Sequence, residues 1–288
     1  THFALWSERK QSVRKYKVVD SVKSETREIN YDKPGDPRTE RVAWVFRADG
    51  RGAAACHSDL TGKTYATDRL DWSADSRLLR SEYIRRGFTG HGVVAYDVKT
   101  GGWRKLFAEE DPKFVYSFNA RYRHDLSEEL TLWASERTGW NHLYAMDLRN
   151  CWALRAVTSG QWVVKQVVHL DAEAKEIYFQ AVGRNAGENP YHQHLCKVGL
   201  DGNGFIDLTP GDAHHEVTFS PDRKTLIDAA SRVDQAPTYT LRSAQDGRAI
   251  ATLGQAELAP LLKAGWSPTK PRSAALPIFW PNCSRSAA

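Results

Sequence analysis

The chain has 288 residues, of which 41% are hydrophobic and 26% are charged, and its formal net charge is +5. These values are typical of a soluble globular protein. No apolar run approaches the 18 residues that a membrane-spanning helix requires, so we expect no membrane insertion. The basic residues are scattered rather than gathered in a stripe, which argues against nucleic-acid binding. The many aromatic residues (10 Trp, 11 Tyr and 10 Phe) favour β-sheet, because such side chains suit pleated, half-buried surfaces.

The four cysteines are widely separated, and no C-x-x-C pair occurs that would indicate a zinc or redox motif. Free thiols are therefore the expectation for Cys56, Cys151, Cys196 and Cys283, with a Cys151–Cys196 bridge as the alternative. The chain opens on Thr1 to Trp6 without the basic and apolar layout of a signal peptide. We expect it to begin inside a domain, and its localisation stays unknown.

In chain order, one phrase recurs: a short apolar strand, then Asp, a few residues, Gly, and a polar stretch into the next strand. Its Asp residues follow one another at intervals of 45 to 54 residues. Asp and Gly close tight hairpins, because Asp tolerates left-handed backbone and Gly has no Cβ to clash. The five copies lie at 44–50, 93–101, 142–147, 195–202 and 239–247.

A second marker runs in phase with the first and consists of an aromatic or apolar residue, a polar turn and another strand. The clearest copies are Leu70–Arg77 and Val217–Lys224, whose Ser-x-Asp segments predict side-chain-to-backbone turns. Weaker copies occur at 122–127 and 168–173, and Phe3–Glu8 resembles a further one, displaced by an insertion around 34–37. A third marker, Thr-x-Gly after an apolar residue, appears at 157–160 and 208–211.

A unit of about 45–50 residues with four short antiparallel strands is typical of a propeller blade. Helical periodicity is convincing only at 257–264. We therefore predict an all-β fold, a partial β-propeller of about five blades over residues 1–268. A β-sandwich is the alternative, although a sandwich gives no reason for five equally spaced copies of a phrase.

The segment Ser135–Tyr144, read as SERTGWNHLY, resembles the blade signature of the dipeptidyl peptidase IV N-terminal domain. Agreement continues through Val157–Val164, Ile177–Ala181, Leu200–Asp212 and Val217–Asp222. The resemblance covers about residues 1–268 and is strongest after Trp133. It implies an eight-bladed propeller joined to an α/β-hydrolase that removes N-terminal dipeptides, often after Pro or Ala. In that family the propeller shields the active site, admits short or unfolded peptides, and supplies two glutamates that grip the substrate amine.

Several residues depart from that family pattern. The glutamate pair falls before residue 1, and Glu109–Glu110 and Glu128–Glu129 are expected to be exposed acidic turn residues. The nucleophile motif G-x-S-x-G is absent, because Pro268 follows Gly265-Trp266-Ser267 where a small residue is needed. We therefore predict no catalytic residue and no catalytic triad, and whether the chain belongs to an enzyme stays open.

Two histidine clusters are candidate metal sites. Adjacent histidines on a strand point to opposite faces, which argues against His214-His215-Glu216. His192-Gln193-His194 places both rings on one strand face, but no third ligand is evident. We predict no metal site and no cofactor.

The final segment, 269–288, is rich in Ser, Arg, Ala and Pro and is expected to be an aberrant or disordered tail. A frameshift or truncation near Lys270 is the favoured origin, and a genuine short tail that packs on the propeller is the alternative. The favoured function is the gating and scaffolding propeller of a dipeptidyl peptidase IV-like serine peptidase, inactive without its α/β-hydrolase domain. The expected partners are that domain, peptide substrates of the full enzyme, and further copies of the chain through open blades. A stand-alone protein- or peptide-binding propeller is the alternative.

Overall fold

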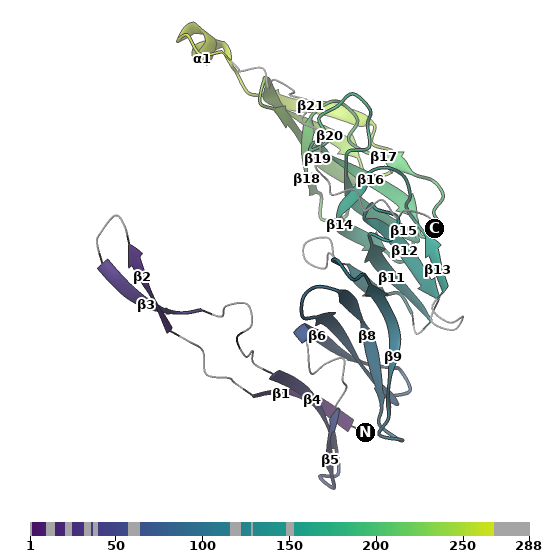
Figure 1. Ribbon diagram of the computed structural model, residues 1–288. Helices are drawn as coiled ribbons and strands as arrows, with labels where there is room; N and C mark the ends of the chain where they lie inside the picture. The colour runs from purple at the N-terminus through teal and green to yellow at the C-terminus, as the bar shows by residue number, and fades with distance from the viewer. Residues whose placement is uncertain are drawn as a thin grey trace, which may run out of the picture. The chain divides into compact units, whose positions relative to one another are not determined.

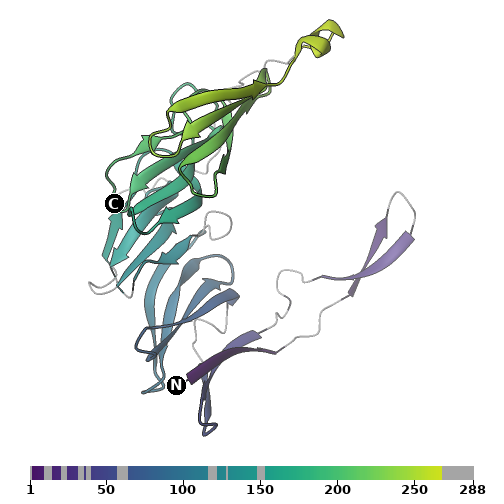
Figure 2. The same ribbon diagram turned by 180° about the vertical axis from the view of Figure 1, so that it is seen from behind.

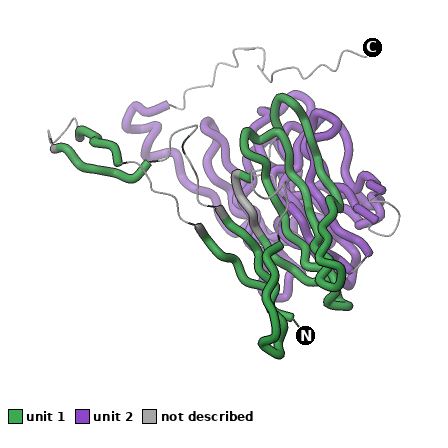
Figure 3. Tube along the Cα trace, turned by 60° about the horizontal axis from the view of Figure 1, so that its bottom comes forward, with its two compact units in different colours: residues 1–117 green, residues 118–288 purple. Residues whose placement is uncertain are grey.

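The computed structural model describes residues 2–9, 15–20, 25–31, 36, 40–56, 64–115, 122–127, 129–147 and 153–267. The chain divides into two compact units, residues 1–117 and 118–288, shown in separate colours in Figure 3. The described residues fold almost entirely into antiparallel β-sheets, which confirms the predicted all-β, propeller-like architecture.

Unit 1 contains three sheets. One has the order β1-β4-β5, one is the two-stranded hairpin β2-β3, and one has the order β6-β7-β8-β9. The strand bounds are β1 His2–Arg9, β2 Lys15–Asp20, β3 Glu25–Asn30, β4 Glu40–Arg47, β5 Ala53–Cys56, β6 Thr64–Trp72, β7 Leu78–Arg85, β8 Gly90–Asp97 and β9 Trp103–Glu110.

Unit 2 contains three four-stranded sheets with the orders β10-β11-β12-β13, β14-β15-β16-β17 and β18-β19-β20-β21, which lie face to face as a stack (Figures 1 and 2). Each sheet is a simple up-and-down meander. The strand bounds are β10 Arg123–Asp125, β11 Leu130–Ser135, β12 His142–Asp147, β13 Ala153–Ala156, β14 Val163–Asp171, β15 Glu176–Val182, β16 Gln193–Gly199, β17 Ile206–Asp207, β18 His214–Phe219, β19 Thr225–Arg232, β20 Gln235–Ser243 and β21 Ala249–Gln255.

The turn chemistry that the repeats predicted is present. The Asp97 carboxylate accepts backbone hydrogen bonds from residues 99 and 100, and Gly101 follows at φ +72°. In the second marker, Ser220 donates to Asp222 at 2.7 Å while its Oγ accepts from the backbone of residue 225. These short polar loops bond their own backbone, so each pair of strands is joined within a few residues.

One predicted repeat is wrong. Phe3–Glu8 was expected to contain a strand followed by a polar turn, but it lies entirely inside β1, which pairs with β4 over eight consecutive residues. Trp44 donates to the Ser7 hydroxyl across this pair, so Ser7 serves the strand ladder and closes no turn. The chain between β1 and β4 includes the hairpin β2-β3, whereas the insertion was predicted around residues 34–37, of which Pro34, Gly35 and Pro37 lie outside the described residues.

The hydrophobic core of unit 2 lies between its sheets. The largest cluster joins β11 and β12 to β14, β15 and β16, and it includes the fully buried Leu132, Leu143, Ile177 and Phe179. A second cluster joins β15 and β16 to β19 through Leu195, Leu208 and Leu226. Burial of apolar side chains between successive sheets contributes about 25 cal/mol per Å². This stacking is what a propeller requires, because no single blade can bury its own faces.

Near the C-terminal end of the described chain, the short helix α1 (Ala259–Lys263) confirms the predicted helical periodicity. Over the ranges described above, no helix has the length and hydrophobicity needed to cross a membrane. Cys56 and Cys196 are free cysteines, as expected, while Cys151 and Cys283 and the predicted tail at 269–288 lie outside the described residues.

Candidate functional site

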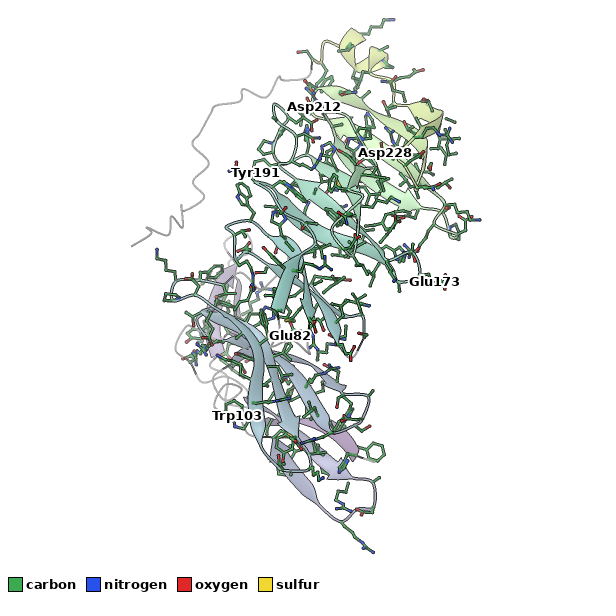
Figure 4. All side chains as sticks on the ribbon, turned by 90° about the vertical axis from the view of Figure 1, so that its right-hand side faces the viewer. Glu82, Trp103, Glu173, Tyr191, Asp212 and Asp228 are labelled. Atoms are coloured by element: carbon green, nitrogen blue, oxygen red, sulfur yellow. The ribbon has the colours of Figure 1, made fainter. Side chains whose placement is uncertain are left out.

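The meander topology of unit 2 gathers alternate loops at one end of the strands. The β15–β16 connection (183–192), the β17–β18 connection (208–213) and the β19–β20 turn (233–234) all lie there, because neighbouring antiparallel strands return to the same edge. Figure 4 shows Tyr191 and Asp212 at this end and Glu173, from the β14–β15 turn, at the opposite end. Function in proteins concentrates on such loops. We name this end of unit 2 the loop face.

The Thr-x-Gly marker shapes the loop face. Thr158 is 5% exposed, and its Oγ1 accepts a hydrogen bond from the backbone N–H of Leu143 on β12 at 2.9 Å. Thr209 is fully buried, and its Oγ1 accepts from Leu195 on β16 at 2.8 Å. Each threonine therefore satisfies a buried strand donor and fixes the loop that leads into the next blade.

The outer layer of the loop face is polar, with one aromatic ring in solvent. Tyr191 is 78% exposed. Beside it in the chain, His192 Nδ1 lies 3.1 Å from Asp212 Oδ1, and Arg232 binds the other oxygen of Asp212. Arg232 also holds Asp234 through two contacts of 2.9 Å. An exposed ring beside a chain of paired charges is a surface suited to recognition.

The inner layer begins with His194. Its ring is 2% exposed, and its Nε2 lies 2.9 Å from Glu188 Oε2, while its Nδ1 lies 3.0 Å from the Thr209 carbonyl oxygen. Asp207 approaches the same Nδ1 at 3.7 Å. Both nitrogens of this histidine therefore face oxygen acceptors.

The adjacent blade contributes a second buried group. His215 Nδ1 lies 2.8 Å from Asp228 Oδ1, and its Nε2 lies 3.1 Å from the Gly211 carbonyl oxygen. Arg242 Nε donates to the other Asp228 oxygen at 2.8 Å. The Asp228 side chain is completely buried, so both of its oxygens depend on these partners.

The electrostatics of this group follow from its contacts. Burial by itself would lower the pKa of His215, but the hydrogen bond and negative charge of Asp228, with smaller effects from Gly211 and Asp207, raise it overall. Burial likewise opposes ionisation of Asp228, yet His215 and Arg242 hold the pKa of that carboxyl below its usual value. By contrast, burial and the charge of Lys165 lower the pKa of His214, which is only partly buried.

The two histidine clusters behave differently from a metal site. His215 points inward to Asp228, while β16 begins at Gln193, so His192 precedes the strand and binds Asp212 rather than sharing a ligand with His194. In the ranges that the structure describes, no group of three His, Cys, Asp or Glu side chains is arranged to hold a metal ion.

The other sequence candidates are not residues of the loop face. The prediction of acidic turn residues is wrong for Glu109 and Glu110, because both lie in β9. Glu110 accepts from Arg85 at 3.0 Å and from Lys105 at 3.3 Å, so it is engaged on its own blade. Glu128 lies outside the described residues, and the backbone of Glu129 donates to Ser127. Ser267 follows α1, separate from the histidines of unit 2 in the chain.

Unit 1 contains one small cavity of about 20 Å³, between the β1-β4-β5 sheet and the β6–β9 sheet. Its walls are mostly apolar and include Trp6, Cys56, Leu79 and Trp103. Burial raises the pKa of the Cys56 thiol to about 11, so this thiol is a poor nucleophile at neutral pH. A space of that size holds a water molecule and no peptide.

Sequence reasoning missed Glu188, Asp207, Asp228 and Arg242. A charged residue within a strand is ordinarily assigned to the solvent-facing side of the sheet. The partners that allow Asp228 to be buried are 13 and 14 residues away in the chain, so no local motif reveals them. The alternation of β19 does carry a signal, because Asp228 occupies the same strand face as the buried Leu226.

Three histidines of the loop face, His192, His194 and His215, are each hydrogen-bonded to a carboxylate. Stacked four-stranded antiparallel meanders define the class of the fold: these are blades of a β-propeller.

Comparison with known proteins shows which family of propeller proteins the chain belongs to. The family model for the dipeptidyl peptidase IV N-terminal region matches residues 1–237, and the chain belongs to this family. A putative dipeptidyl aminopeptidase IV from Bacteroides ovatus is similar in structure, with a TM-score of 0.65 and 20% identity over 89% of this chain and 38% of that one. Dipeptidyl peptidase 4 of Porphyromonas gingivalis gives a TM-score of 0.67 and 18% identity over 91% and 37%. The chain therefore spans little more than a third of either protein's length.

Proposed function

We propose that this chain is the gating and scaffolding propeller part of a dipeptidyl peptidase IV-like serine peptidase, and that it has no peptidase activity without an α/β-hydrolase domain. The observation that carries the proposal is the family match over residues 1–237 together with a site whose acid and base groups are all engaged with one another. A propeller of this kind would limit which peptides reach a catalytic centre supplied elsewhere, and peptide substrates would meet it in that context.

Two measurements test the proposal. The purified chain is exposed to a serine-directed fluorophosphonate probe and to a Gly-Pro-p-nitroanilide substrate, and we expect neither labelling nor release of nitroaniline. The P. gingivalis relative serves as the active control. Stoichiometric labelling of this chain, abolished by heat denaturation, would refute the claim that it lacks catalytic machinery.

Gating is tested separately by building a chimera in which this chain replaces the corresponding blades of the P. gingivalis relative. We expect the chimera to cleave a short peptide and to spare a folded protein with the same N-terminal sequence. A hydrolase domain without any propeller is the control, and it should cleave both if the blades are what excludes folded chains. Equal cleavage of the folded protein by chimera and control would contradict a gating role.

A second candidate function is binding of another protein, including a further copy of this chain, through an open blade. The β18–β21 sheet packs one face on its neighbour, but its other face leaves Ile227 39% exposed and Tyr239 44% exposed. Exposed apolar faces of this kind mark sites of protein–protein interaction. Analytical ultracentrifugation of the chain and of an I227S/Y239S variant distinguishes the possibilities: we expect concentration-dependent association that the variant loses, and a sharp monomer for the unaltered chain would count against self-association.

A further inference from the structure

The joint between the last two blades of unit 2 is built around two histidine rings. His194 on β16 and His215 on β18 have ring centroids 5.0 Å apart, with their planes inclined at 45°. Both side chains are almost completely buried. Gln193 reaches across the same joint and donates to the His215 carbonyl oxygen at 3.1 Å. The two rings therefore lie in a closed space between blades, where hydrogen bonds and charges interact more strongly than in water.

The contacts of the His215 ring specify its protonation, and those of His194 are given for comparison. A neutral imidazole donates through one nitrogen and accepts through the other, whereas an imidazolium donates through both. His215 faces a carboxylate at 2.8 Å and a carbonyl oxygen at 3.1 Å, and neither partner carries a hydrogen to donate. His194 faces the Glu188 carboxylate at 2.9 Å and the Thr209 carbonyl at 3.0 Å. The Asn185 amide also approaches His194 Nε2, but at 3.5 Å the contact is too long to replace that with Glu188.

Charged groups surround both rings. The anions facing them are Glu188 from the β15–β16 connection, Asp207 on β17 and Asp228 on β19, and Arg242 on β20 is a cation beside Asp228. On β14, Lys165 binds Gln193, which crosses the same joint, and at the solvent edge His192 binds Asp212.

At the preceding joint of unit 2, between the β10–β13 and β14–β17 sheets, the equivalent positions are occupied by uncharged side chains. There, Asn141 donates to the Val164 carbonyl oxygen as Gln193 donates to the His215 carbonyl oxygen, so Val164 occupies the position equivalent to His215. Phe179 lies two residues before the strand partner of Val164, as Asp228 lies two residues before the strand partner of His215. Phe179 is therefore equivalent to Asp228, and its ring stacks on Trp162 with the centroids 6.0 Å apart. Since this fold packs well with apolar groups at one joint, the buried ions at the other are not needed for packing.

His142 provides a natural reference at that apolar joint. Its Nδ1 lies 3.0 Å from the Thr158 hydroxyl and its Nε2 lies 2.9 Å from the Gly160 carbonyl oxygen. A hydroxyl can donate, so a neutral ring protonated on Nε2 satisfies both contacts. Burial lowers the pKa of His142, which favours the same neutral form.

We propose that the joint between the β14–β17 and β18–β21 blades is a proton-operated lock, closed when His215 is an imidazolium and loosened when this ring loses its proton. Deprotonation places a nitrogen lone pair of His215 against the Asp228 carboxylate or the Gly211 carbonyl oxygen, at a buried position. The Leu195, Leu208 and Leu226 contacts keep the blades folded, so the change is a local opening rather than global unfolding.

The sign of the pH dependence follows from the direction of the His215 shift. Because its pKa in the folded chain is raised, the stabilisation is complete below the ordinary histidine value of about 6.5 and is lost as the pH rises through the folded value. The lock is therefore closed at mildly acidic pH and opens toward alkaline pH.

The first test uses the whole chain labelled with ¹⁵N in histidine, with imidazole nitrogen shifts recorded between pH 6 and pH 9. At pH 6 we expect His215 to show two protonated nitrogens and His142 to show one. A neutral His215 ring at pH 6 would overturn the proposal, whatever the state of the other histidines.

The second test measures amide hydrogen exchange at pH 6 and pH 9, corrected for the intrinsic effect of pH. Loss of a hydrogen bond to a charged group corresponds to at least about tenfold faster exchange, which we expect in β16 and β18. Strands β11 and β12, at the reference joint, should change far less. Equal protection of β16 and β18 at both pH values would overturn the lock.

Variants locate the effect. H215Q cannot titrate at this position, so we expect it to abolish the difference between pH 6 and pH 9. H142Q is the matched control, a buried histidine at the neighbouring joint, and it should retain the full difference. A pH difference that persists in H215Q would overturn the lock, and the NMR titration decides the question if the variant fails to fold.

Discussion

Removal of a single hydroxyl from the Thr-x-Gly marker should destabilise unit 2 measurably. Thr209 is fully buried, and its Oγ1 accepts the Leu195 N–H at 2.8 Å. T209V preserves the shape of the side chain but leaves that buried donor without its acceptor, which costs about 1–3 kcal/mol. With a urea m-value of roughly 1–3 kcal/mol/M, the midpoint of unfolding should fall by about 1 M.

The assay is urea unfolding of the whole chain, followed by circular dichroism at 218 nm. T209S keeps the hydroxyl and loses only a methyl group, so it should stay within about 1 kcal/mol of the unaltered chain. T158V is the parallel variant, and it should cost at least as much, because Thr158 Oγ1 serves both the Leu143 N–H and the His142 ring. If T209V is as stable as the unaltered chain while T209S is not, the methyl group rather than the hydroxyl holds the joint, and the reasoning fails.

Three further results are expected. F179A should destabilise unit 2 by about 3–5 kcal/mol in the same urea assay, because Phe179 is fully buried and a cavity would replace it. G247A should also destabilise it, because Gly247 has φ +74° and an added Cβ would lie 2.7 Å from Leu208 Cα; G187A, also at positive φ but with open space around it, is the control. Burial and Glu176 raise the pKa of Tyr178 to about 12, so its contribution to stability should be lost between about pH 10 and pH 12, and absorbance at 295 nm should show a step near pH 12 that Y178F lacks; an unchanged titration of Y178F in that range would contradict the burial argument.

The sequence predicted those parts of the fold that short-range chemistry determines. The Asp97 and Ser220 turns form because each side chain bonds backbone groups within a few residues of itself. Their regular spacing then requires several similar meanders, and propeller blades are the arrangement that buries them. Phe3–Glu8 failed as a marker for the same reason: its residues fit a turn, but eight ladder pairs with β4, a segment more than thirty residues away, hold it as a strand.

The site was harder to predict because its partners are distant in sequence. His192 and His194 were expected to share a strand face, yet the strand begins between them, and each binds a carboxylate from a different connection. Asp228 and Arg242 carried no motif, and only their positions on β19 and β20 bring them to His215. A single sequence shows which residues are charged, but the register of three strands decides which charges are buried together.

The two joints of unit 2 also show where specificity can arise in a repeated fold. Thr158 and Thr209 do the same work at both joints, so the marker that identifies the repeat is structural. What differs is the layer beneath it, where Trp162 and Phe179 at one joint correspond to Ala213 and Asp228 at the other. A buried ionic network costs desolvation that an aromatic stack does not. Of the two joints in unit 2, only the one between the β14–β17 and β18–β21 blades contains such a network, and we attribute this to the pH response proposed for it. The other joint serves packing alone.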